Sequence, residues 1–289
     1  MPIFYILILA VVQGLAELLP VSSSAHVVVT EKLLGLDPSS PPMTLLLVML
    51  HTGTMFAVIV YFWRQWQVTY FESMFAFKRF AALVVLATAF TGLIGEAIIK
   101  IIEKIAFRGA PHAEIEDLFS HLELIAPALA VGGILILIAG IFEKRNRSGG
   151  SAKTNDLTAT QAGIIGAVQG LCLPFRGFSR SGATISAGML LRVAKSSAEL
   201  FSFALAVVLT PPVVAREVMR VVHAANTSGT VTFASAAFPS LLGAVFAFLA
   251  GLVALKWLSQ WLEAGRWYLF GIYCLLAAAA VGYLHHLGY

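Results

Sequence analysis

The sequence predicts an all-α integral membrane protein with about six transmembrane helices and two re-entrant hairpins of broken helices, folded as one membrane domain. Of its 289 residues, 59% are hydrophobic and only 12% are charged. A soluble domain carries about a quarter charged residues, so the chain has too few charges for a water-facing surface. Apolar runs recur along the whole chain, and two of them are interrupted by polar and helix-breaking residues.

Six apolar runs are long enough to cross a bilayer, whose hydrocarbon core needs about 20 residues per helix. Tryptophan and tyrosine lie near the ends of several runs, where amphipathic rings meet the membrane boundary. The predicted spans are residues 45–62, 80–99, 124–142, 200–222, 238–258 and 267–284.

Two further apolar stretches each indicate a helix, a break and a second helix. Residues 3–34 are interrupted at Glu17 and across 20–26, and residues 161–192 are interrupted across 174–182. Proline removes a backbone donor and glycine loosens a helix. Non-helical backbone at membrane depth is tolerated only beside protein or a water-filled cavity, so each stretch is a candidate re-entrant hairpin.

The two broken hairpins resemble each other. The tetrad VQGL occurs at 12–15 and again at 168–171, and a serine-rich break follows each copy. Each hairpin precedes three spans, an odd number, so the second half would be inverted relative to the first. We therefore expect inverted repeats over about 1–142 and 161–289, joined by a basic cytoplasmic loop at 143–160. Such repeats place a site at their breaks, and they occur in many transporters.

Charge distribution predicts the orientation. The segments 63–79, 143–160 and 192–195 are basic, whereas 100–123 is acidic, so the first three are expected inside the cell and the last outside, with both termini outside. The net charge of +4 is modest, and the basic residues are not gathered with aromatic residues on a soluble face. This pattern indicates a bilayer as the partner and excludes nucleic acid.

The first break contains an acidic residue at membrane depth. Glu17 follows Gln13 by four positions, so both project from one helical face. An ionisable group in a membrane segment indicates a functional site. The two side chains could hold a hard divalent cation through oxygen atoms, together with substrate phosphate. The structural alternative is a carboxylate paired with Arg176 or Arg180.

Hydroxyl groups and an imidazole follow within ten positions of Glu17. Ser22 and Ser23 could simply cap the next helix, and His26 could be a satisfied buried histidine. Their combination with Glu17 favours chemistry instead. Ser23 could be a nucleophile with His26 as general acid or base, and direct attack by water fits the spacing equally well.

The second break supplies the opposite charge. Arg176 and Arg180 lie among hydroxyl residues just before an expected helix start, with Ser179, Ser181 and Thr184 as the hydroxyls. A phosphate needs such cations, hydroxyl and amide donors, and the positive end of a helix. These residues could also only cap a helix, but a buried Arg180 without an anion would cost several kcal/mol.

Three motifs together resemble those of the undecaprenyl-diphosphate phosphatases of bacterial inner membranes. That family carries (E/Q)xxxE, PVSSxxH and PGxSRSxxT, which correspond here to residues 13–17, 20–26 and 176–184. The resemblance covers nearly the whole chain in motif order, span number and repeat design. One position departs from it, because Arg176 stands where the third motif usually begins with proline.

The resemblance implies a hydrolase, dependent on Mg2+ or Ca2+, that removes the terminal phosphate of undecaprenyl diphosphate and so recycles the lipid carrier for peptidoglycan. It further implies a site open to the periplasm and a link to bacitracin resistance. By the family pattern, the essential residues are Glu17, Ser23, His26 and Arg180, supported by Gln13, Ser22, Ser179, Ser181 and Thr184. A homodimer is one of the assemblies that the sequence leaves open.

Two other functions compete with hydrolysis. A polyprenyl-phosphate transporter or flippase is supported by the inverted repeat alone, but it has no use for a serine nucleophile. Loss of Ser23 with lipid binding intact would therefore favour the enzyme. A structural membrane scaffold predicts that changing Glu17 or His26 affects stability only.

Overall fold

The computed structural model describes residues 2–36, 41–106, 122–146, 156–228 and 233–288. The ten elements found in these ranges are all α-helices, which confirms the predicted all-α class. The central part of the acidic segment, 107–121, and the central part of the basic loop, 147–155, lie outside the described residues.

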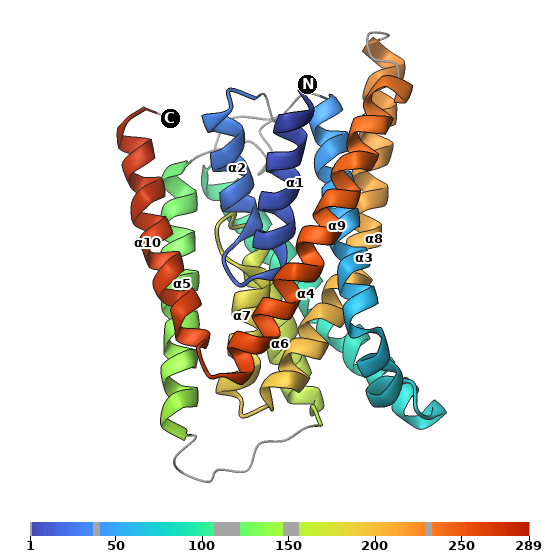
Figure 1. Cartoon of the computed structure of the whole chain (residues 1–289). Helices are drawn as coiled ribbons and strands as arrows, with labels where there is room; N and C mark the ends of the chain where they lie inside the picture. Colours follow the sequence, from blue (N-terminus) through green and yellow to red (C-terminus); the bar gives the residue numbers. More distant parts are fainter. Residues whose placement is uncertain (1, 37–40, 107–121, 147–155, 229–232, 289) are drawn as a thin grey trace.

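Along the chain, each of two pairs of short helices is followed by three long helices (Figure 1). The short pairs are α1 (Ile3–Leu18) with α2 (Ser23–Leu33), and α6 (Ala159–Cys172) with α7 (Arg180–Leu190). The long helices are α3 (Pro41–Tyr70), α4 (Met74–Ala106), α5 (Leu122–Asn146), α8 (Lys195–Ser228), α9 (Phe233–Glu263) and α10 (Trp267–His286).

Each long helix contains a stretch long and apolar enough to cross a membrane, which confirms the six predicted spans. These stretches are Met43–Tyr70, Met74–Ile105, Leu122–Arg145, Lys195–Arg216, Phe238–Glu263 and Trp267–His286.

The short helices form two hairpins that enter the bundle from opposite ends. In Figure 1, α1 begins and α2 ends near the end of the bundle where α10 finishes, whereas α6 begins and α7 ends at the other end. This is the course that two re-entrant hairpins would take. The re-entrant arrangement and the division into inverted repeats stay predictions.

Local sequence explains the first break. Helix α1 ends at Leu18 because Leu19 precedes a proline and adopts an extended conformation, with φ −75° and ψ 150°. Ser22 caps α2 by accepting a hydrogen bond from the Ala25 N–H at 3.5 Å. Its φ of 69° is uncommon for a residue other than glycine, and such conformations cluster at functional sites.

The second break is built in the same way. Ser179 caps α7 and accepts a hydrogen bond from the Gly182 N–H at 3.2 Å. Gly177 just before it has φ 105°, and an added Cβ would lie 2.5 Å from the Ile125 carbonyl oxygen of α5. Glycine is therefore required at this position both by the backbone and by the close approach of α5.

The repeated VQGL tetrad serves one packing role twice. An added Cβ at Gly14 would lie 2.6 Å from a side-chain atom of α9, and one at Gly170 would lie 2.7 Å from a backbone oxygen of α4. The neighbouring Gln13 and Gln169 are both fully buried. Glycine lets α1 approach α9 and α6 approach α4 closely, as small residues do in membrane bundles.

The core is apolar, and so is much of the outer surface. Phe62 and Phe203 are buried and stack with ring centroids 5.3 Å apart, and Trp267 is buried as well. Large apolar side chains are exposed along the outer faces of α4, α5, α9 and α10, among them Val85, Leu93, Val131, Val253 and Leu276. A lipid environment accounts for such faces, since exposed apolar area of this extent is rare in soluble monomers.

Candidate active site

The two breaks meet inside the bundle. The Gly177 N–H of the second break donates a hydrogen bond to the Ser24 hydroxyl at 3.3 Å, and the Ser181 hydroxyl donates one to the Leu19 carbonyl oxygen at 3.4 Å. Segments about 160 positions apart in the chain are thereby joined at one point, as predicted for broken hairpins that form a shared site.

A cavity of about 280 Å3 lies where they meet. It is lined by Ala16, Glu17, Ser22, Ser23, Ser24, His51, Cys172, Leu173, Phe175, Arg176, Phe178, Ser179, Arg180 and Ser181. Most of the predicted site residues are in this lining. A larger hollow of about 440 Å3 lies elsewhere, lined by Ile141, Lys144, Arg145 and Tyr268, and the described part of its lining offers no carboxylate.

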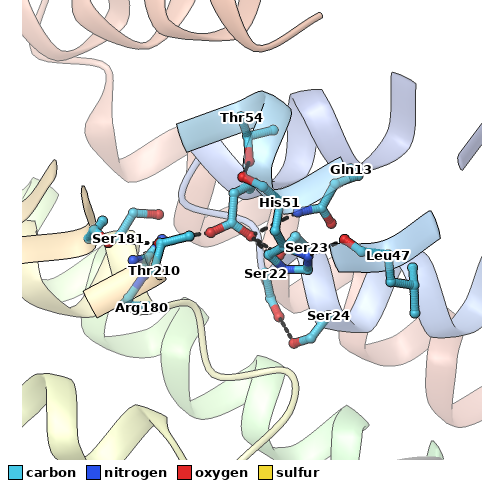
Figure 2. A network of polar contacts seen from close by, with 12 residues as sticks. Gln13, Ser22, Ser23, Ser24, Leu47, His51, Thr54, Arg180, Ser181 and Thr210 are labelled. Carbon is cyan, nitrogen blue, oxygen red and sulfur yellow. Dashed lines mark hydrogen bonds and ion pairs between the residues drawn. The ribbon is translucent and has the colours of Figure 1, made fainter. Parts of the chain in front are cut away.

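Glu17 is the centre of the polar network. Its Oε1 pairs with Nη2 of Arg180 at 2.6 Å, and its Oε2 accepts hydrogen bonds from Ser23 Oγ at 2.5 Å and Gln13 Nε2 at 3.2 Å. Nε2 of His51 lies 3.7 Å from the same Oε2. Figure 2 shows the side chains of Gln13, Ser23, His51 and Arg180 converging from helices of both halves of the chain. Arg180 is thus the arginine that pairs with Glu17.

The cavity suits an anion. Arg180 and Arg176 both line it, whereas Glu17 is the one carboxylate in its described lining. Helix α7 begins at Arg180 and helix α2 begins at Ser23, so the positive ends of two helices also face this region. One guanidinium nitrogen of Arg180 contacts Glu17, and the planar fork carries further N–H donors suited to phosphate.

Several predicted hydroxyls are engaged in hydrogen bonds that hold the helices of the site. Thr184 is fully buried, donates to the Arg180 carbonyl oxygen at 2.8 Å and lies 2.6 Å from the Ser202 hydroxyl of α8. Thr184 does not line the cavity and instead fixes the first turn of α7. Ser22 and Ser179 line it, but their side chains are engaged as helix caps.

His26 does not line the cavity. Its Nδ1 lies 2.8 Å from the Ser22 carbonyl oxygen, and its Nε2 lies 2.7 Å from the hydroxyl of Tyr273 on α10. The two rings stack with centroids 5.7 Å apart. The structure therefore places Glu17, Ser23 and Arg180 together and leaves His26 outside their cavity, as a link between α2 and α10.

His51 of α3 was not among the residues singled out in the sequence, yet its imidazole lines the cavity beside Glu17. The sequence did contain a signal for His51, because it is an ionisable residue inside the predicted span 45–62. Sequence spacing could not place it beside Glu17, since this contact depends on how α3 packs against α1.

Arg176 lies near a second carboxylate that was also not singled out. Glu31 of α2 is only 1% exposed. Burial raises the pKa of the Glu31 carboxyl to about 7, against the opposing effect of the Arg176 charge. The arginine that replaces the usual motif proline thus faces a buried acid on the other hairpin.

Replacing Arg176 with alanine is expected to weaken folding more than catalysis. Loss of the guanidinium leaves Glu31 buried without this cation, and we expect a loss of about 1–3 kcal/mol in the free energy of unfolding. The double variant Arg176→Ala/Glu31→Gln should recover most of that loss, because the coupled partner is neutralised as well. Thermal melts in detergent measure both, and equal melting temperatures for the single and double variants would contradict this coupling.

The cavity supplies oxygen donors of the kind that a divalent cation needs. Among the described residues, no group of three or more His, Cys, Asp or Glu side chains could hold a metal ion. The cavity does offer Glu17, serine hydroxyls, and the neighbouring buried Gln13 Oε1, which has no hydrogen-bond partner. Mg2+ is commonly held by one or two carboxylates with phosphate and water, so these oxygens fit an ion shared with a phosphate substrate.

Comparisons with known proteins point to one family. A family model described as "Bacitracin resistance protein BacA" matches residues 6–280. The chain is 56% identical over 284 residues to a protein of Acinetobacter baylyi named "Undecaprenyl-diphosphatase 2", with 97% of each chain covered. It is 31% identical over 286 residues to "Undecaprenyl-diphosphatase" of Desulfosudis oleivorans, with 93% of each covered.

Proposed function

The chain belongs to the bacitracin resistance protein BacA family, and we propose on this premise that it is an undecaprenyl-diphosphatase. It hydrolyses undecaprenyl diphosphate to undecaprenyl phosphate and inorganic phosphate, and so recycles the lipid carrier of peptidoglycan and envelope synthesis. The observation that carries the proposal is one cavity in which the hydroxyl of Ser23 and the guanidinium of Arg180 both contact the carboxylate of Glu17.

The contacts support a role for each of the three groups. Ser23 already donates its proton toward Glu17 at 2.5 Å, so Glu17 can accept that proton as Ser23 Oγ attacks the terminal phosphorus. Arg180 and the N-terminus of α7 stabilise the charge on the transferred phosphoryl group. The lipid monophosphate then leaves with the electron pair of the broken P–O bond.

The lipid nature of the substrate fits the surroundings of the cavity. Leu173 and Phe175 belong to its lining and are both more than 40% exposed, next to the charged groups. A diphosphate head can thus lie on Arg180 while the adjoining apolar chain stays among apolar side chains. This arrangement favours an amphipathic phosphate over a soluble one.

A divalent cation, Mg2+ or Ca2+, is proposed as the cofactor. Glu17 and Gln13 would hold it with oxygens of the substrate, and when bound it would neutralise charge on the diphosphate. The remaining chemistry belongs to the residues already described.

The membrane that holds the protein, and its orientation there, are proposed from the family and from the distribution of charge. The protein is a multi-pass membrane protein, and we propose the bacterial inner membrane with the site reached from the periplasm. Arg79, near the start of α4, pairs with Asp156 just before α6 at 3.0 Å. This contact brings the basic segment 63–79 to the end of the bundle where the second hairpin enters. The positive-inside rule favours the cytoplasm for that end. We also propose that the protein assembles as a homodimer.

Purified protein in detergent should release phosphate from undecaprenyl diphosphate, and excess EDTA should lower the rate at least about 10-fold, with recovery on adding Mg2+ or Ca2+. Glu17→Ala should abolish release in both conditions, because it removes both the proton acceptor and the metal oxygen. Activity unchanged by EDTA would overturn the metal proposal alone. Absence of release with lipid binding retained would overturn the hydrolase and favour a transporter.

A further inference from the structure

The His51 imidazole is held in one tautomer. Its Nδ1 lies 2.9 Å from the Leu47 carbonyl oxygen in the preceding turn of α3. A carbonyl oxygen can only accept, so Nδ1 carries the proton in this contact and the neutral ring keeps its lone pair on Nε2. Nε2, the basic nitrogen, therefore points away from the backbone of α3.

That nitrogen faces the reacting groups. Nε2 of His51 lies 3.7 Å from Glu17 Oε2, beyond direct hydrogen-bond distance, and the side chain is 44% exposed within the cavity lining. The same Glu17 oxygen accepts the proton of Ser23. Figure 2 shows His51 next to Ser23 on one side of the network, opposite Arg180.

His26 lacks such an available nitrogen. Its Nδ1 faces the Ser22 carbonyl oxygen and so carries a proton, and its Nε2 is occupied by the hydroxyl of Tyr273 at 2.7 Å. Of the two imidazoles in this region, His51 alone belongs to the described cavity lining.

We propose that His51 is a catalytic residue of the phosphatase, the general base that activates water through Nε2. The inference rests on the proposed function and deepens it. In the second half of the reaction, water oxygen bonds to the phosphorus held on Ser23 while the bond from phosphorus to Ser23 Oγ breaks. The proton of the water passes to His51, and Glu17 returns its proton to Ser23 Oγ. His51 then releases its proton to solvent, which restores the starting state.

The experiment compares the full-length wild type, His51→Gln and His26→Gln, with undecaprenyl diphosphate in detergent. His51→Gln should lower kcat about 100-fold and leave KM within about threefold. Rapid quenching should also show phosphorylated enzyme accumulating, because the first half of the reaction does not need His51. His26→Gln should not accumulate phosphorylated enzyme, whatever its effect on the rate.

A second variant separates chemistry from folding. Added imidazole should restore the rate of His51→Ala at least about 10-fold, which a merely structural role would not allow. Phosphorylated enzyme that accumulates in His26→Gln and not in His51→Gln would overturn the proposal, as would a kcat of His51→Gln within about threefold of wild type. Failure of the wild type to release phosphate would instead overturn the proposed function itself.

Discussion

Replacement of Arg180 by alanine is expected to lower phosphate release at least about 10³-fold, because its guanidinium stabilises the charge on the transferred phosphoryl group. Arg180 is the guanidinium that contacts Glu17, and it begins the helix whose N-terminus faces the cavity. Arg180→Lys keeps the charge but loses the planar fork, so it should recover only part of the rate. Steady-state kinetics on undecaprenyl diphosphate measures both variants.

Folding and catalysis can be separated for this residue. Arg180→Ala leaves Glu17, only 16% exposed, without its cation and should lower the melting temperature. Arg180→Ala/Glu17→Gln should regain stability because no buried charge remains unpaired, yet it should stay inactive. Arg176→Ala is the matched control, since it removes the other arginine of the same cavity and should keep most of the activity. Equal losses for the two arginines would contradict the role assigned to Arg180.

Replacement of Ser23 by alanine is expected to lower kcat at least about 10³-fold while the protein still binds its lipid. The reason is the 2.5 Å hydrogen bond from Ser23 Oγ to Glu17, which joins the nucleophile to its proton acceptor. Binding should survive because Arg180 and the start of α7 remain. Lipid binding and turnover are measured separately on the same purified variant.

Ser24→Ala provides the matched control for Ser23. The Ser24 hydroxyl accepts from the Gly177 N–H and lies 3.2 Å from Ser22 Oγ, without contacting Glu17 through any described bond. Its loss should lower kcat less than about 10-fold, by loosening the junction of the two breaks. Similar rates for the two variants would show that Ser23 is not the nucleophile and that water attacks the phosphorus directly.

The contact between Glu17 and Arg180 could be predicted from the free-energy cost of placing an unpaired charge inside a membrane. Each residue is a charge between apolar flanks, and each would be expensive at membrane depth without an opposite partner. The pairing seen at 2.6 Å was one of the two alternatives that this argument left open. Arg176 was the other, and its position beside Glu31 depends on where α2 lies relative to the second break.

The two histidines illustrate the opposite case. His26 lies in a serine-rich break near Glu17 in the sequence, but the direction of its side chain depends on where α2 begins and on the approach of Tyr273 from α10. His51 is 34 positions from Glu17 and reaches it only through the packing of α3 on α1. Nearness along the chain therefore favoured His26, whereas the fold brings His51 to the carboxylate.

The sequence by itself determined the membrane class, the six spans and the position of both breaks. Each follows from a local property: the length of an apolar run, a proline that ends α1, and serines that cap α2 and α7. Only the tertiary structure decided which side chains share the cavity, because helices far apart in the chain set those distances. Thr184 accordingly is buried outside the cavity lining, whereas His51 belongs to the lining.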